Sequence, residues 1–252
     1  MIRAGDLEYA LARVAARFGE RPGEAAWRSL TVIRGMPALL DAARSSSFRR
    51  WTVGVAPDVD PHAIEAALRA NRRALVDEVR VWMPAEWQDG VVWAGVFAEL
   101  PVAQYLARGG APLPWMRDDP VFRELCTEVP VPGATRPLAA LARAWSDPDG
   151  FMRVWRAEWQ RRIPAGARSD HALLDAFARV VAQHHAALAD PAARDGVLPR
   201  RTLASRLALL YRRAISDPAA AFIFLALSAL DMERLRGELL RRAIFPRFGV
   251  AS

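Results

Sequence analysis

The stretch from Asp217 to Phe245 most constrains what this chain can fold into. Its first half, Ala219 to Leu230, is apolar on every side of a helix, so a helix there must be surrounded by other parts of the chain. Asp217 suits an N-cap and Pro218 the first helical position. The apolar half is well below the roughly 20 residues needed to cross a bilayer. We therefore expect a central core helix.

The second half of this stretch predicts a helix with one charged face. Leu235 and Leu239 fall on its inward side, whereas its acidic and basic residues are expected to face outward. Basic residues near the end also suit the negative end of a helix dipole. We predict that the arginines of this face bind a partner: they are Arg234, Arg236, Arg241 and Arg242.

Helical spacing of apolar residues extends through most of the chain. Ile64, Leu68, Leu75 and Val79 form one such stripe, and similar stripes recur from the N-terminus to the C-terminus. Strand signals are nearly absent, and the nearest to one, Thr52 to Asp60, is short and ends at a proline, so we interpret it as a loop. The predicted fold class is all-α, with about ten helices joined by short connections.

Proline-rich segments indicate how the chain is organised. We predict N-terminal helical lobes over residues 1–110, a proline-rich connection with a short helix over 111–136, and C-terminal helical lobes over 137–252. A single continuous domain is the alternative. Pro101 is expected to kink or split the helix that contains it.

The chain is strongly basic, and all of its basic residues are arginine. It carries a formal net charge of +7, with 35 basic residues and no lysine. Without lysine, a phosphate-binding P-loop and Schiff-base chemistry are excluded. Guanidinium groups pair well with carboxylates and phosphates. An acidic protein, lipid headgroups and nucleic acid all remain open as partners.

No pattern predicts a catalytic, metal or cofactor site. The four histidines are His62, His171, His184 and His185, and adjacent helical positions place the rings of the last two about 100° apart. We expect His184 to be a hydrogen-bonded core residue and His185 to lie at the surface. The single cysteine, Cys126, excludes an internal disulfide and is expected to fill space in the core.

The nine tryptophans allow two interpretations. Trp155 and Trp159 lie four residues apart on a predicted helix, which favours core aromatics covered by arginine stems. The alternative is a basic helical module for nucleic acid, in which such tryptophans stack on bases. An enzyme with a site that the sequence does not reveal is a third hypothesis.

Five short segments share the order of motifs found in one known family. They are Tyr9 to Val14, Leu39-Leu40 with Ser46-Ser47-Phe48, Asp60 to Leu68, Glu99 to Gly109, and Ala219 to Arg242. In these segments the chain resembles the C subunit of archaeal and bacterial V/A-type ATPases, called subunit d in eukaryotes. It departs from that family's pattern at Arg49, which replaces a glycine, and at Arg234 and Val102, which replace asparagines. It is also short around 111–136.

The resemblance implies two or three similar helical lobes around a central hollow. It also implies an adaptor without a catalytic step, a small-molecule substrate or a cofactor, which couples the central stalk to the membrane rotor ring in proton or sodium transport. The N-terminus holds no apolar run typical of a signal peptide. We therefore expect a cytoplasmic protein attached peripherally to the inner membrane through its complex.

Overall fold

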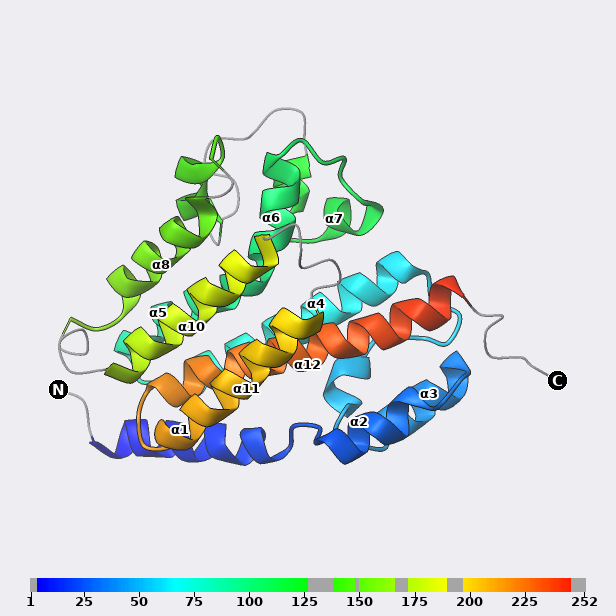
Figure 1. Cartoon of the computed structure of the whole chain (residues 1–252), viewed down its shortest axis with the longest axis horizontal. Coiled ribbons are helices and arrows are strands. Elements are labelled where there is room, and N and C mark those ends of the chain that lie inside the picture. Colours follow the sequence, from blue (N-terminus) through cyan, green and yellow to red (C-terminus); the bar gives the residue numbers. More distant parts are fainter. Residues whose placement is uncertain (1–3, 127–137, 148–149, 166–171, 190–196, 246–252) are drawn as a thin grey trace.

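The computed structural model describes residues 4–126, 138–147, 150–165, 172–189 and 197–245 (Figure 1). These residues form α-helices and short 3-10 helices without a strand, which confirms the all-α prediction. The α-helices are α1 (Ala4–Gly19), α2 (Glu24–Thr31), α3 (Met36–Arg44), α4 (Pro61–Trp82), α5 (Ala85–Val96), α6 (Leu100–Ala107), α7 (Pro114–Asp118), α8 (Phe151–Arg162), α10 (Ala172–Ala189), α11 (Val197–Arg213) and α12 (Ala219–Ile244). The 3-10 helices are η1 (Arg49–Thr52), η2 (Phe97–Glu99), η3 (Arg123–Cys126) and η4 (Ala139–Ala144).

Two long helices, α4 and α12, form the centre of the molecule (Figure 1). They pack against each other along their length, and α12 also contacts α1, α3, α5, α10 and α11. In Figure 1 the blue N-terminal helices lie along the lower edge, and α5, α8 and α10 lie on the opposite side of the central pair. Helices from both ends of the sequence therefore share one apolar core.

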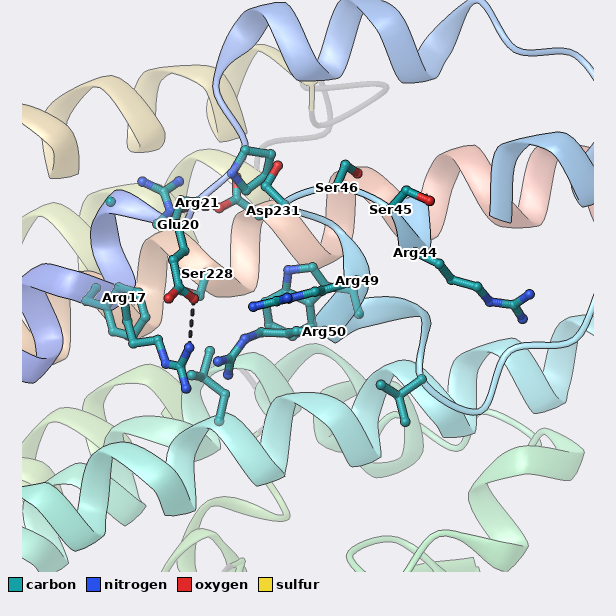
Figure 2. Close-up of a pocket in the computed structure, with 17 residues that line it drawn as sticks. Arg17, Glu20, Arg21, Arg44, Ser45, Ser46, Arg49, Arg50, Ser228 and Asp231 are labelled. Carbon is teal, nitrogen blue, oxygen red and sulfur yellow. Dashed lines mark hydrogen bonds and ion pairs between the residues drawn. The ribbon is translucent and has the colours of Figure 1, made fainter. Parts of the chain in front are cut away.

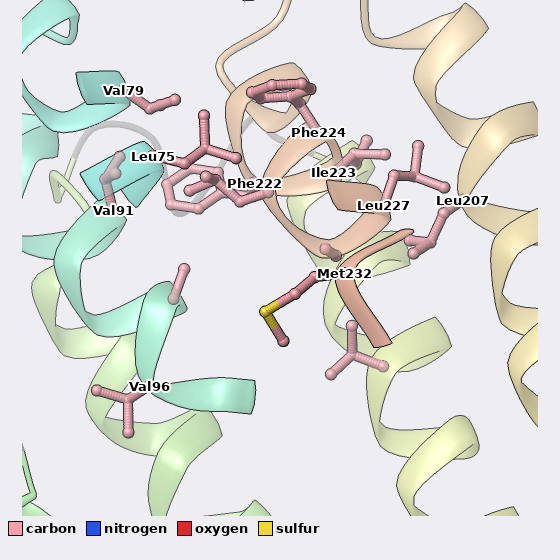
Figure 3. Packing of buried hydrophobic residues seen from close by; sticks show 14 of the residues in the cluster. Leu75, Val79, Val91, Val96, Leu207, Phe222, Ile223, Phe224, Leu227 and Met232 are labelled. Atoms are coloured by element: carbon pink, nitrogen blue, oxygen red, sulfur yellow. The ribbon is translucent and has the colours of Figure 1, made fainter. Parts of the chain in front are cut away.

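The apolar half of α12 is buried on every side as far as Ser228, whereas its last two residues, Ala229 and Leu230, are half-buried. Every residue from Ala219 to Ser228 is buried. Figure 3 shows Phe222, Ile223 and Phe224 pointing in different directions among side chains of α4, α5 and α11. The ring of Phe222 lies 5.2 Å from that of Trp159 in an edge-to-face arrangement, a favourable geometry for an aromatic pair.

Local signals in the sequence place several helix ends. Asp60 caps α4 as its N-cap residue by accepting a hydrogen bond from the His62 N–H. The start of α12 lies one residue later than predicted, with Pro218 rather than Asp217 as N-cap, and Asp217 Oδ1 accepts a hydrogen bond of 2.7 Å from the Ala219 N–H. The 3-10 turn of η2 interrupts the helix just before Pro101, so the predicted split is confirmed. Gly109, with φ of +81°, ends α6 in the left-handed conformation that favours glycine.

The proline-rich segment packs closely on α4. Trp115 of α7 is buried, and the guanidinium of Arg69 lies 4.3 Å from the centre of its ring. The short helix expected in this segment is α7, while residues 127–136 lie outside the described part of the chain. The three-part domain division and the lobes around a hollow stay predictions.

One helical stretch, Ala85–Ala107, is long and apolar enough to cross a membrane by length and composition alone. It comprises α5, η2 and α6. Within the fold, 56% of its most apolar window is buried. Trp93, at its centre, donates from Nε1 to the Trp155 carbonyl at 2.8 Å, and Trp155 donates back to the Trp93 carbonyl at 3.1 Å. This reciprocal pair fixes α5 to α8.

A buried network of ion pairs ties α4 to its neighbours. Arg69 bonds Glu65 one turn earlier at 2.8 Å and also bonds Glu99 at the end of η2. Arg72 bonds the same Glu99 at 2.9 Å, and Glu65 accepts a further bond from Arg236 of α12. The side chains of the two glutamates are only 5% exposed. A buried charge requires such partners, because its desolvation is otherwise uncompensated.

Breaking this network should strongly destabilise the fold. Glu99→Ala leaves two buried guanidinium groups without their shared carboxylate, so the free energy of unfolding should fall by about 3–5 kcal/mol. Chemical denaturation followed by circular dichroism measures this loss. The control is Asp77→Ala, which removes an exposed pair with Arg80 and should change stability by about 0.5 kcal/mol or less. Equal effects of the two substitutions would contradict a central role for Glu99.

Candidate functional site

The structure separates the four arginines predicted to bind a partner. Arg242 does not face outward: it is only 5% exposed. Its Nε donates to the Ile33 carbonyl at 2.9 Å, and its Nη1 donates to Glu238 Oε2 at 2.7 Å. The prediction that Arg242 lies at the surface was wrong because the loop between α2 and α3 folds against α12. Its backbone carbonyls need donors, and Arg242 supplies them.

Arg236 is also engaged inside the molecule. Its Nε bonds Glu65 of the buried network, and its side chain is 38% exposed. Burial opposes the charged form, but Glu65 more than compensates, and the pKa of Arg236 is raised. We assign Arg236 chiefly to fixing α12 on α4.

Arg234 and Arg241 remain at the surface. Arg234 bonds Glu24 of α2 at 2.7 Å, and its guanidinium lies 4.3 Å from the ring centre of the buried Trp27. Arg241 has a side chain that is 56% exposed and pairs with Glu238, one turn earlier, at 3.0 Å. Exposed pairs of this kind are weak and exchange readily with other carboxylates.

The exposed end of α12 and the neighbouring loop form a hollowed surface. A cavity of about 810 Å³ lies between residues 31–34 and the end of the helix. Large apolar side chains flank it, with Val32 75% exposed and Phe245 54% exposed. We call this the α12-end surface, defined by Val32, Arg34, Arg241, Ile244 and Phe245.

A second cavity, of about 910 Å³, lies where α1, the turn after α3, α4 and α12 meet (Figure 2). We call it the basic groove. In Figure 2, Arg17, Arg49 and Arg50 extend toward a common space, whereas Arg44 points away from it. Its polar lining residues are Arg17, Glu20, Arg21, Arg44, Ser45, Ser46, Ser47, Arg49, Arg50, Ser228 and Asp231.

Carboxylates hold most of the groove's arginines in place. Glu78 accepts bonds from Arg17 at 2.5 Å and from Arg50 at 3.0 Å. Partial burial opposes the charged form of Glu78, but these two donors hold its pKa below the usual range. In the part of the chain that the structure describes, the exposed Arg49 has no ion pair.

Asp231 forms the inner wall of the groove beside Ser228. Its Oδ2 lies 2.7 Å from Arg21 Nε. Burial nevertheless raises the pKa of Asp231 to about 6, because the cost of desolvating the charge exceeds the effect of Arg21. The groove therefore contains a carboxyl group that titrates close to neutral pH.

Sequence reasoning did not identify this groove. Its arginines come from α1 and the turn that follows it, and from the end of α3 and the turn that follows α3, and no local motif joins them. In the sequence, Ser46, Ser47, Phe48 and Arg49 stand out only through the family resemblance. The serine hydroxyls and arginine guanidinium groups within residues 45–50 could have indicated an anion site. Only tertiary packing, however, brings this turn next to α1 and α12 to form the groove.

The remaining candidates are the histidines and the tryptophans Trp155 and Trp159. His184 is buried as predicted, but its Nδ1 has no hydrogen-bond partner in the described part of the chain, and burial lowers its pKa to about 4. His185 is half-buried rather than exposed, and its Nε2 lies 3.3 Å from Gln104 Oε1. Trp155 and Trp159 are fully buried, which confirms the core interpretation and excludes them as a surface for stacking bases.

His171 lies outside the described residues. Within those residues, no group of three His, Cys, Asp or Glu side chains could hold a metal ion.

Comparisons with known proteins give no relative of this chain. No protein-family model, no curated protein and no solved structure matches it. Function must therefore be inferred from the geometry of the chain and from the motifs in its sequence.

The different roles of Arg241 and Arg242 can be tested by measuring how their substitution changes the free energy of unfolding. Arg242→Met should lower the free energy of unfolding by about 3 kcal/mol, because it removes a buried guanidinium that pairs with Glu238 and leaves two partly buried carbonyl groups without donors. Arg241→Met removes an exposed group and should cost about 0.5 kcal/mol or less. Thermal or urea denaturation of both variants measures the difference. A stable Arg242→Met variant would show that this side chain is not an anchor.

Asp231 should make stability depend on pH. Its folded-state pKa of about 6 lies above the ordinary value of 3.8, so the folded state binds more protons between these values. Its contribution is therefore present at low pH and lost as the pH rises from about 4 through about 6, by on the order of 3 kcal/mol. We expect the stability of the wild type relative to Asp231→Asn to fall over this range. Urea denaturation at several pH values measures it, and a constant difference would contradict the assignment.

Proposed function

We propose that this chain is a non-catalytic adaptor of a V/A-type rotary ATPase, placed between the central stalk and the membrane rotor ring. The motif resemblance, from Tyr9 to Arg242, supports this assignment. An adaptor of this kind receives one protein on one face and another on a second face. It would be attached to the cytoplasmic side of the inner membrane through the ring, in a complex that moves protons or sodium ions.

The observation that carries the proposal is the α12-end surface. It places exposed apolar side chains, Val32 and Phe245, beside the exposed cation of Arg241 around one cavity. Buried apolar anchors with charged residues at the rim are the usual composition of a protein interface. The complementary partner segment is an apolar one that carries carboxylates.

The rigidity of this surface also suits the proposed role. A subunit that transmits torque must not deform where its partner is attached. Arg242 fixes the end of α12 to the α2–α3 loop through the Ile33 and Thr31 carbonyls, and Arg236 fixes its middle to Glu65 of α4. The exposed groups therefore project from a helix that is anchored at two points.

Capture of partner subunits tests the proposal. The tagged full-length chain is incubated with detergent-solubilised membranes of its own source, and stalk and ring subunits are identified by mass spectrometry. Recovery of these subunits with the wild type is expected, with a loss of about tenfold or more for the double variant Val32→Asp and Arg241→Glu. The matched control is Arg153→Glu. It also reverses the charge of an exposed arginine, but Arg153 belongs to α8 and is not part of the α12-end surface.

Two outcomes would contradict the proposal. The first is that the wild type recovers no rotary-ATPase subunit. The second is that the double variant and Arg153→Glu recover equal amounts, which would indicate charge attraction without a defined surface. Recovery of nucleic acid that falls steeply with salt would instead favour the nucleic-acid-binding alternative.

A further inference from the structure

The basic groove contains hydrogen-bond donors that the fold itself does not use. Within the described part of the chain, the guanidinium of Arg49 and the hydroxyl of Ser47 have no hydrogen-bond partner, and both line the groove. The hydroxyls of Ser45 and Ser46, by contrast, donate to the Asp41 and Ala43 carbonyls. Ser47 and Arg49 are thus two donors of different chemistry, two residues apart on one turn.

The paired arginines of the groove keep further donors available. Arg50 uses Nη1 to bond Glu78, and Arg21 uses Nε to bond Asp231. An arginine has five N–H donors in a planar fork, so each guanidinium can still donate to another anion. The carboxylates hold these forks in fixed positions, which reduces the entropy lost when a ligand binds.

The groove also has an excess of positive charge. Four of its arginines carry this charge, namely Arg17, Arg21, Arg49 and Arg50, because Arg44 points away from the common space and pairs with Asp41 (Figure 2). The carboxylates that line the groove or pair with these four arginines are Glu20, Glu78 and Asp231. Glu78 is ionised at neutral pH because its pKa is lowered by Arg17 and Arg50. The carboxylates therefore orient the arginines without cancelling their charge.

The volume and the lining of the basic groove indicate what kind of ligand fits it. The volume of about 910 Å³ lies within the range of about 300–1,000 Å³ that is usual for small-molecule sites. Trp51, Val53, Leu75 and Phe224 also line the groove and add apolar surface to it. A ligand with one strongly anionic group and a less polar remainder fits this division.

We propose that the basic groove is a binding site for the phosphate group of a small organic phosphate or of a lipid headgroup. A carboxylate offers only two acceptor oxygens, both in one plane. A phosphate presents three or more acceptor oxygens, which matches several guanidinium groups with a hydroxyl beside them. Arg49 and Ser47 bind the phosphate directly, and Arg17, Arg21 and Arg50 surround it. This site is independent of the partner surface at the end of α12.

Calorimetric titration of the full-length chain with pyrophosphate tests the site. Saturable 1:1 binding is expected, and acetate at the same ionic strength should not reproduce it. Arg49→Ala should weaken binding by about tenfold or more, which corresponds to the loss of one charged hydrogen-bonding group. Because Arg49 is exposed and makes no ion pair in the described structure, this variant should fold, and circular dichroism checks that it does.

The matched control is Arg153→Ala, which removes the same charge from an exposed site on α8. It should leave pyrophosphate affinity within about twofold of the wild type. Equal weakening by Arg49→Ala and Arg153→Ala would overturn the proposal, because it would show attraction by net charge alone. Absence of saturable pyrophosphate binding, together with absence of vesicle binding, would overturn it as well.

Vesicle flotation distinguishes the two sources of phosphate. The wild type and Arg49→Ala are mixed with vesicles of phosphatidylcholine, with or without phosphatidylglycerol. Flotation that needs phosphatidylglycerol and Arg49 supports a lipid headgroup as the ligand. Pyrophosphate binding without flotation supports a soluble organic phosphate.

Discussion

The buried bonds of Glu65 and Glu99 to three arginines hold the centre of this protein together. They join α4 to η2 and to α12, where apolar packing alone would allow the helices to slide or rotate. Apolar contacts supply most of the free energy of folding, but they are not directional. Paired charges in a low-dielectric interior are tolerated only in a narrow geometry. The network therefore specifies how the two longest helices face each other.

Arginines elsewhere in the fold also donate hydrogen bonds to backbone carbonyls or to carboxylates. Arg242 satisfies carbonyls of the α2–α3 loop, and Glu78 holds Arg17 and Arg50 at the edge of the basic groove. Much of the basic content of the chain is thus used internally, and net charge alone is a poor guide to its binding surfaces. The groups available for partners are those that the fold leaves exposed, with Arg49 in the groove and Arg241 at the end of α12 as the clearest cases.

Both proposed binding surfaces depend on α12. Its middle, at Ser228 and Asp231, forms a wall of the groove, and its end carries the surface proposed to meet a partner. The apolar half of the helix is surrounded by other helices and fixes the position of both surfaces (Figure 3). A phosphate and a protein partner would accordingly be bound on the same rigid element, at separate places.

The sequence by itself determined the all-α class, the burial of most of the apolar half of α12, the cap at Asp60 and the core position of Trp155 and Trp159. These features depend on local periodicity and on short-range hydrogen bonds, which neighbouring residues encode. Tertiary structure alone decided that Arg242 is buried, that Glu65, Glu99 and Arg236 meet, and that Arg49 faces the same space as Arg17. An arginine on a helix has the same local pattern whether it is exposed or buried beside a partner. Whether it is buried depends on a partner far away in the sequence, such as Ile33 for Arg242, and only tertiary packing brings the two residues together.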